Sequence, residues 1–175
     1  MSYSEELTKA MTWLGEQPDA VFVGQSIAYT GNAMYKTLSG VPMNKRIELP
    51  VAEEMQMGIS LGMSLTGKTV ISIYPRMDFL LLAVNQLVNH LDKLEEFTHS
   101  EYHAKVIIRV GIGATKPMYP GIQHCGDYTL PLRNILRNVR VWRLGRAEEI
   151  SRIYTNAYCC SWSSLIIEDM NNYNV

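Results

Sequence analysis

The sequence predicts a doubly wound α/β domain, with a mostly parallel sheet and helices on both of its faces. Three segments rich in Val and Ile, at 20–29, 69–75 and 104–113, alternate with segments whose apolar residues recur at helical spacing. Nearly continuous apolar strands are typical of parallel sheets that are covered on both faces. Right-handed crossovers between such strands produce the doubly wound arrangement.

The first part of the chain predicts a helix, a strand, a helical turn and a second strand. Ser4 and the acids after it mark a helix that ends before Pro18. We expect a strand over 20–29, which ends in turn residues, then a helical turn over 33–39 and a short strand over 45–49.

The middle of the chain begins at Pro50, which suits the start of a helix but not its interior. We therefore expect a helix over 52–65, closed by Gly67. A strand over 69–75 follows. Apolar residues at 84, 87, 88, 91 and 94 then predict a helix over 77–98.

The last part of the chain contains a long expected loop. Residues 114–129 hold two prolines and two glycines between a strand over 104–113 and the elements that follow. Those later elements are expected to be a helix over 129–137, a strand over 139–144, a helix over 146–161 and a strand over 164–169. We expect residues 1–175 to form a single domain with a sizeable core.

Composition excludes several classes of protein. A net charge of −1 argues against a surface built to hold nucleic acid. The chain has no apolar run of about 18 residues that could span a membrane, and its N-terminus lacks the pattern of a signal peptide. Three cysteines, Cys125, Cys159 and Cys160, make a poor disulfide framework and fit reduced thiols. We expect a cytoplasmic protein.

Familiar nucleotide and metal motifs are also missing. No GxGxxG follows a strand, and no P-loop or GxSxG sequence occurs. The glycine-rich segment 111–116 has the wrong spacing for a phosphate loop. No cluster of His, Cys and acidic residues predicts a metal site in this chain.

Glu53 and Glu54 are the first candidate functional residues. They begin a helix that is otherwise apolar nearly all round, so we expect that helix to be buried on several sides. Gly58 and Gly62 within it would let another backbone approach closely. The two acids could simply stabilise the first turn of the helix, by about 0.3–1 kcal/mol each. Alternatively, one of them faces a ligand at an interface.

Two further candidate groups lie near strand ends. His124 stands in the long loop, where a histidine is more often a surface or packing residue than a functional one. Tyr74 and Phe79 flank the turn after the strand over 69–75, where aromatics are usually core. The carboxyl ends of parallel strands are nevertheless where ligands bind.

Taken in order, these stretches resemble the pyrimidine-binding domain of thiamine diphosphate enzymes of the transketolase and 2-oxoacid dehydrogenase group. The strongest likeness is to the first half of the dehydrogenase beta subunit. The helix start at 49–67 resembles the family motif TP-x-(A/S)-E-x-x-x-x-G, which aligns the family's glutamate with Glu53. Residues 83–93 resemble its A-x-D-Q-x-x-N-x-A-A-K helix, and 122–129 resemble the QHSQ and THHGAFD segments.

The resemblance implies roles for five residues. The glutamate of the family bonds a ring nitrogen of the aminopyrimidine and favours the imino tautomer, which generates the ylide; this role falls to Glu53. Phe79 and Tyr74 are expected to pack near the pyrimidine. His124 is expected to face the substrate and move protons. Gln25 stands where many beta subunits have a glutamate and is expected to contact the cofactor.

Three positions depart from the family pattern. Gln25 stands in place of the glutamate of many beta subunits, Arg76 falls where transketolases have a phenylalanine, and Gly126 replaces the glutamine of QHSQ. These departures leave open whether the reaction is ketol transfer, acyl transfer or 2-oxoacid decarboxylation.

The family's diphosphate-binding domain, with its GDG…N motif for diphosphate and Mg²⁺, has no counterpart in this sequence, nor does the transketolase C-terminal domain. The resemblance therefore implies one subunit of a split enzyme, inactive without a partner that carries GDG…N and binds Mg²⁺. The active complex is expected to be an α2β2 heterotetramer that acts on a small-molecule substrate. The alternative is a non-catalytic α/β module that assembles with or regulates a partner.

Overall fold

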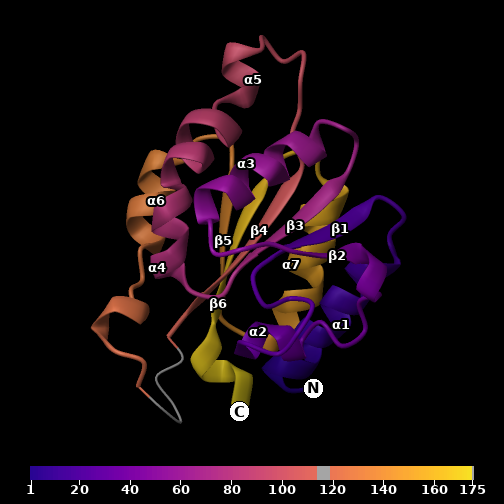
Figure 1. Cartoon of the computed structure of the whole chain (residues 1–175), viewed down its shortest axis with the longest axis vertical. Helices are drawn as coiled ribbons and strands as arrows, with labels where there is room; N and C mark the ends of the chain where they lie inside the picture. The colour runs from indigo at the N-terminus through magenta and orange to yellow at the C-terminus, as the bar shows by residue number, and fades with distance from the viewer. Residues whose placement is uncertain (114–118, 175) are drawn as a thin grey trace.

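The computed structural model describes residues 1–113 and 119–174. Its centre is a six-stranded sheet of order β2-β1-β3-β4-β6-β5, in which every pair of neighbouring strands is parallel (Figure 1). The strands are β1 Ala20–Gly24, β2 Arg46–Glu48, β3 Thr69–Tyr74, β4 Val106–Ile112, β5 Arg140–Leu144 and β6 Ser164–Asp169. The predicted doubly wound α/β fold is confirmed.

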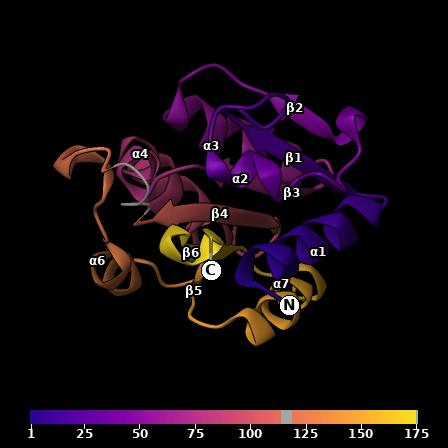
Figure 2. The same cartoon turned by 90° about the horizontal axis from the view of Figure 1, so that it is seen from below.

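The helices divide between the two faces of this sheet. The α-helices are α1 Tyr3–Glu16, α2 Ala33–Lys36, α3 Glu53–Ser64, α4 Met77–Leu80, α5 Leu94–Phe97, α6 Thr129–Ile135 and α7 Ala147–Cys159. The shorter turns are η1 Met43–Lys45, η2 Leu81–Ala83, the π-helical η3 Gln86–Leu91, η4 Ile122–His124 and η5 Met170–Asn174. Helices α1 and α7 lie together against one face, and α3, α4 and α6 lie over the other (Figure 2).

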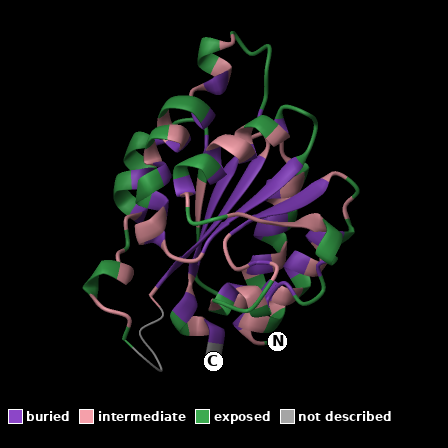
Figure 3. Ribbon diagram, in the orientation of Figure 1, coloured by how far each residue is buried: buried purple, intermediate pink, exposed green. Residues whose placement is uncertain are grey.

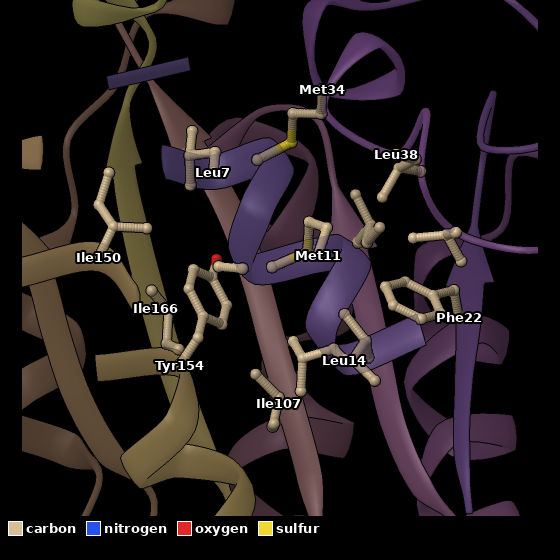
Figure 4. Close-up of a cluster of buried hydrophobic side chains, with 14 of the residues drawn as sticks. Leu7, Met11, Leu14, Phe22, Met34, Leu38, Ile107, Ile150, Tyr154 and Ile166 are labelled. Atoms are coloured by element: carbon tan, nitrogen blue, oxygen red, sulfur yellow. The ribbon is translucent and has the colours of Figure 1, made fainter. Parts of the chain in front are cut away.

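Each face of the sheet has its own apolar core. On the first face, side chains of α1 and α7 meet those of the strands, as Leu14 and Tyr154 do beside Ile107 (Figure 4). On the second face, Met57 of α3 and Leu80 of α4 pack over β3 and β4. Both cores are buried because the strands carry apolar side chains on both sides, as a doubly covered parallel sheet requires.

A buried ion pair ties β4 to β6. Arg109 and Glu168 have no exposed surface and form two hydrogen bonds, Nε to Oε1 at 2.6 Å and Nη2 to Oε2 at 2.9 Å. The hydroxyls of Tyr154 and Tyr173 also donate to Glu168. Several donors on one carboxylate offset part of the cost of removing the two charges from water.

Several expected element boundaries are wrong. Ser2, not Ser4, caps α1, because it forms a reciprocal capping box with Glu5. The first strand stops at Gly24. The backbone after Gly24 leaves the sheet, and Glu48 accepts its amides instead.

The expected continuous helix over 77–98 is also wrong. It is broken into α4, η2, η3 and α5, with a π-helical stretch in the middle. Apolar spacing predicted a helix here but could not reveal the extra residue that a π turn accommodates. Gly67 has φ +85° and ends the α3 segment as predicted.

Helix α3 is not buried on several sides in this chain. Its outward face is exposed or half-exposed, and the buried positions are mostly polar (Figure 3). Within the described residues, no helix has the length and hydropathy needed to cross a membrane.

Candidate active site

The candidate residues gather at the carboxyl ends of β1, β3 and β4. The chain leaves β1 toward β2 on one side and later returns to β3 on the other, so the connections diverge between these two strands. Such a point of divergence is where open parallel sheets bind ligands. Gln25 directly follows β1, and Arg76 lies two residues after β3.

Glu53 is the centre of a first hydrogen-bonded group. It is the first residue of α3 and is only 4% exposed. Gln25 Nε2 donates to Glu53 Oε1 at 3.0 Å, and the Tyr74 hydroxyl donates to the Glu53 carbonyl at 3.3 Å. No donor among the described residues bonds Glu53 Oε2. The structure therefore orients one carboxylate oxygen and leaves the other available.

Neighbouring Glu54 differs from Glu53 in every respect that matters for a site. It is exposed and accepts a hydrogen bond from Gln86 Nε2 at 3.1 Å. An exposed acid in the first turn of a helix is explained by the helix dipole alone. That explanation fits Glu54, whereas Glu53 is buried and has a polar partner, Gln25, from the loop after β1.

The loop that carries Gln25 is held by a carboxylate that sequence reasoning missed. Glu48, at the end of β2, accepts the backbone N–H groups of Ser26, Ile27 and Ala28, the last two at 2.9 Å. Ser26 has φ +52°, which turns successive N–H groups toward one acceptor. Nothing in the local sequence signals this contact, because about twenty residues separate the two segments.

His124 is the centre of a second group. Its ring meets Phe79 edge to face, with centroids 5.6 Å apart and planes at 74°. Arg76 Nη1 donates to the His124 carbonyl at 2.7 Å, so this arginine supports the loop backbone. His124 Nδ1 is buried and has no partner within the described part of the chain. Buried ring nitrogens are normally hydrogen-bonded, so this atom is a candidate ligand contact.

Asp78 anchors the residues after His124. Its carboxylate accepts the Gly126 N–H at 3.1 Å from Oδ2, and the Tyr128 hydroxyl lies 3.4 Å from Oδ1. The expected loop over 114–129 is thus held to α4 in its second part. Residues 114–118 of that loop lie outside the described residues.

The structure brings together Gln25, Glu53 and Tyr74 in one group, and Phe79 and His124 in the other. Tyr74 has no exposed surface, and burial raises the pKa of its hydroxyl. It therefore supports Glu53 from within the protein. In the part of the chain that the structure describes, no three His, Cys, Asp or Glu side chains are grouped closely enough to hold a metal ion. A groove of about 580 Å³ between α1 and α7 is lined by none of the five candidate site residues.

Comparison with known proteins gives partial but consistent matches. The chain is 27% identical over 100 residues to the pyruvate dehydrogenase E1 component subunit beta of Cyanidium caldarium, a match covering 55% of this chain and 30% of that protein. It is 25% identical over 118 residues to the 2-oxoisovalerate dehydrogenase subunit beta of Bacillus subtilis (strain 168), covering 65% of this chain and 36% of that protein. No family model matches the chain.

Among solved structures, a split-gene transketolase described as an inactive β4 tetramer superposes with a TM-score of 0.72. The superposition covers 96% of this chain and 51% of that one at 20% sequence identity, so the likeness concerns the fold. The resemblance to the pyrimidine-binding domains of thiamine diphosphate enzymes is confirmed. As a pyrimidine-domain-like chain, it matches about a third of the length of the curated beta subunits.

Proposed function

We propose that this chain is the pyrimidine-binding subunit of a split thiamine diphosphate enzyme that transfers ketol or acyl groups or decarboxylates 2-oxoacids. The observation that carries the proposal concerns Glu53. This residue is buried near the carboxyl ends of the parallel strands, with Oε1 bonded to Gln25 and Oε2 available. A carboxylate oxygen in that position fits a ring nitrogen that must share a proton. When bound, thiamine diphosphate supplies the stabilisation of a carbanion beside a carbonyl.

Glu53 is the residue that would hold this proton. Because its carboxylate is almost wholly removed from water, a hydrogen bond at Oε2 gains strength from the low local dielectric. Gln25 fixes the orientation of the carboxylate, and Glu48 fixes the loop that presents Gln25. The Tyr74 hydroxyl donates a hydrogen bond to the backbone carbonyl of Glu53 and so helps to position this residue.

His124 is the proposed proton-transfer residue toward the substrate. The edge contact with Phe79 positions its ring and the bond from Arg76 holds its backbone, while Nδ1 has no partner among the described residues. Phe79 is half-buried and would supply an apolar surface beside the pyrimidine. General acid–base groups must be within hydrogen-bond reach of the reacting atoms. Glu53 and His124 both lie at the carboxyl ends of the strands.

A partner chain is part of the proposal. On the outward side of α3, Met55 is 41% exposed and Leu65 is 43% exposed, and a Cβ added at Gly58 or Gly62 would meet nothing within 4 Å. A helix face of this composition suits close approach of another backbone. We propose that a diphosphate-binding subunit with a GDG…N motif, which also binds Mg²⁺, covers this region in an α2β2 heterotetramer.

The first experiment is purification of the tagged chain from its native host, with mass spectrometry of partners and an assay for bound thiamine diphosphate. A stoichiometric partner with GDG…N and bound cofactor is the expected result. A chain that purifies alone without cofactor would instead favour the non-catalytic assembly or regulatory module.

The decisive variants are Glu53→Gln and Glu54→Gln, each in the reconstituted complex. Glu53→Gln keeps an acceptor for Gln25 but removes the ionisable proton, so we expect kcat to fall about 100-fold or more. Glu54→Gln makes the same chemical change one residue away on the exposed surface and should leave kcat unchanged. Cofactor affinity, measured by calorimetry, gives a readout independent of turnover. Full activity of Glu53→Gln in an intact complex would contradict the role of Glu53.

A further inference from the structure

An arginine-rich segment at the β5 edge of the sheet has no part in the proposed reaction. From Tyr128 to Ala147 the chain contains five arginines, no lysine and no acid, although the whole protein has a net charge of −1. These arginines are Arg133, Arg137, Arg140, Arg143 and Arg146. They lie on α6, on the connection after it, and on and after β5.

Strand β5 is an open edge of the sheet. Among the strands of the described residues it pairs only with β6, and it lies between α6 and α7 in Figure 2. The Arg140 N–H donates to the Ser163 carbonyl at 3.0 Å, toward β6. Because backbone groups of successive residues point to opposite sides of a strand, those of Val141 and Arg143 point to the open side. The open side of the strand therefore offers backbone donors and acceptors that no strand of residues 1–113 or 119–174 pairs with.

A groove of about 350 Å³ runs along this edge. Arginines line it from both sides: Arg133 and Arg137 from the α6 segment and Arg140 from the strand. Its apolar lining includes Leu136, Val141 and Trp142. The groove thus combines cationic side chains with an apolar surface directly beside the open strand.

The three groove arginines have no carboxylate partner among the described residues. Arg143 is different, since its Nη1 lies 2.7 Å from Asp127 Oδ2. Arg140 stacks over the Trp162 ring at 5.1 Å, which orients its guanidinium without neutralising it. Unneutralised arginines of one sign attract an anionic partner.

A protective role alone does not account for this arrangement. Charged side chains on an edge strand prevent pairing between copies of a protein, but that role does not explain an apolar groove lined by three arginines beside the strand. The opposite edge shows the simpler solution: β2 has only three residues and is followed by Pro50.

The geometry also favours one class of anion. The arginines are spread along the strand, which suits an extended chain better than a single phosphate. Single-stranded nucleic acid is usually held by stacking on exposed aromatic rings, whereas Trp142 and Trp162 are half-buried with their Nε1 atoms buried.

We propose that the β5 edge binds an extended acidic peptide segment of another protein as a seventh strand. Backbone pairing with Val141 and Arg143 would supply affinity. The groove arginines would select acidic side chains, and the apolar lining would receive the alternate residues.

The test uses the full chain and a fluorescein-labelled peptide of nine residues in which glutamate and valine alternate. Fluorescence anisotropy at an ionic strength of about 0.15 M should show saturable binding. Two N-methylated peptides separate backbone pairing from charge attraction, because methyl groups on alternate amides block one side of a strand and leave the other free. We expect one methylation frame to abolish binding and the other to preserve it.

Charge selectivity is tested with matched double variants. Arg133→Glu with Arg137→Glu should weaken binding about tenfold or more. Lys36→Glu with Lys68→Glu changes the net charge equally at exposed sites outside the groove and should not weaken it. Absence of saturable binding, equal binding of both methylated peptides, or equal loss in the two double variants would each overturn the proposal. So would competition by an oligothymidylate as effective as that of the unlabelled peptide.

Discussion

Helices α1 and α3 lie on opposite faces of one sheet, yet they use their side chains in opposite ways. Helix α1 buries an apolar stripe made of Tyr3, Leu7, Ala10, Met11 and Leu14. Helix α3 buries a mostly polar stripe and exposes apolar residues. Within that polar stripe, Gln56 Nε2 and Ser60 Oγ each donate to Ser72 Oγ, at 3.1 and 3.0 Å.

The contrast separates a helix that serves folding from one for which we propose a role in assembly. The sheet and α7 cover the apolar stripe of α1, so this stripe needs no other chain to bury it. The polar stripe of α3 gains stability from hydrogen bonds to β3, whereas apolar residues on its outward face, such as Met55, remain exposed. Exposed apolar surface rimmed by polar residues is typical of interaction sites.

The largest expected difference is between Leu14→Ala on α1 and Met55→Ala on α3. Leu14 has no exposed surface, so truncation should lower the free energy of unfolding of the chain by about 2–5 kcal/mol. Met55 is exposed, and its truncation should change that free energy by about 0.5 kcal/mol or less. Urea unfolding of the isolated chain measures both. Similar losses for the two variants would remove the distinction between the helices.

A smaller effect of opposite sign is expected for Gly62→Ala. Alanine is favoured over glycine in a helix by about 1 kcal/mol, and the added Cβ meets nothing within 4 Å, so the isolated chain should become more stable. The same methyl group should weaken the proposed complex, because it keeps the partner backbone away. Gly67→Ala is the control: its φ of +85° predicts destabilisation without an effect on assembly. Unchanged assembly by Gly62→Ala in analytical ultracentrifugation would contradict the role of this face.

The smallest effect concerns pH and the end of the α1 segment. Burial alone would raise the pKa of Asp19, but hydrogen bonds from Thr69 and Tyr158, both at 2.6 Å, outweigh it and lower this pKa. The hydrogen bond between Tyr158 and Asp19 also raises the pKa of Tyr158 to about 12. A carboxyl whose folded-state pKa is lowered stabilises the protein above its unfolded pKa of about 3.9, and the contribution is lost as the pH falls through the folded-state value.

Asp19→Asn should therefore be less stable than the native chain near neutral pH, and the two should converge below about pH 4. Unfolding free energies measured across the acidic range give this difference directly. A constant difference at every pH would show that the hydrogen bonds, and not the charge, matter at Asp19.

The sequence predicted the sheet well because burial on both faces leaves a strong local signal. The run 69–75 is mostly apolar, and its position is retained in β3, where all six residues are buried. What could not be predicted depends on contacts distant in sequence. One such feature is the π-helical stretch Gln86–Leu91. The other is the early end of β1, where Glu48 accepts the amides of the following loop, a contact that no local sequence pattern reports.

The candidate site shows the same limit. The order of the motifs indicated Glu53, Gln25, Tyr74, Phe79 and His124. The structure groups these residues at the carboxyl ends of the strands. Sequence reasoning did not reveal how they are supported. Arg76 was an unexplained departure from the family pattern until its bond to the His124 carbonyl gave it a structural role. The expected burial of α3 followed from its composition, whereas which face it buries depends on polar partners in β3.

The order of strands in the sheet has a consequence for synthesis. Strand β6 is made after β5 but is inserted between β4 and β5. During translation, β1, β2, β3 and β4 can assemble while β5 still lacks β6, the neighbour it has among the described strands, and Arg109 still lacks Glu168. Emergence of the segment from Ser164 to Asp169 then joins β5 to the sheet and neutralises the buried charge in a single late step. The nascent chain therefore remains incomplete, with β5 open on both sides, until that segment leaves the ribosome.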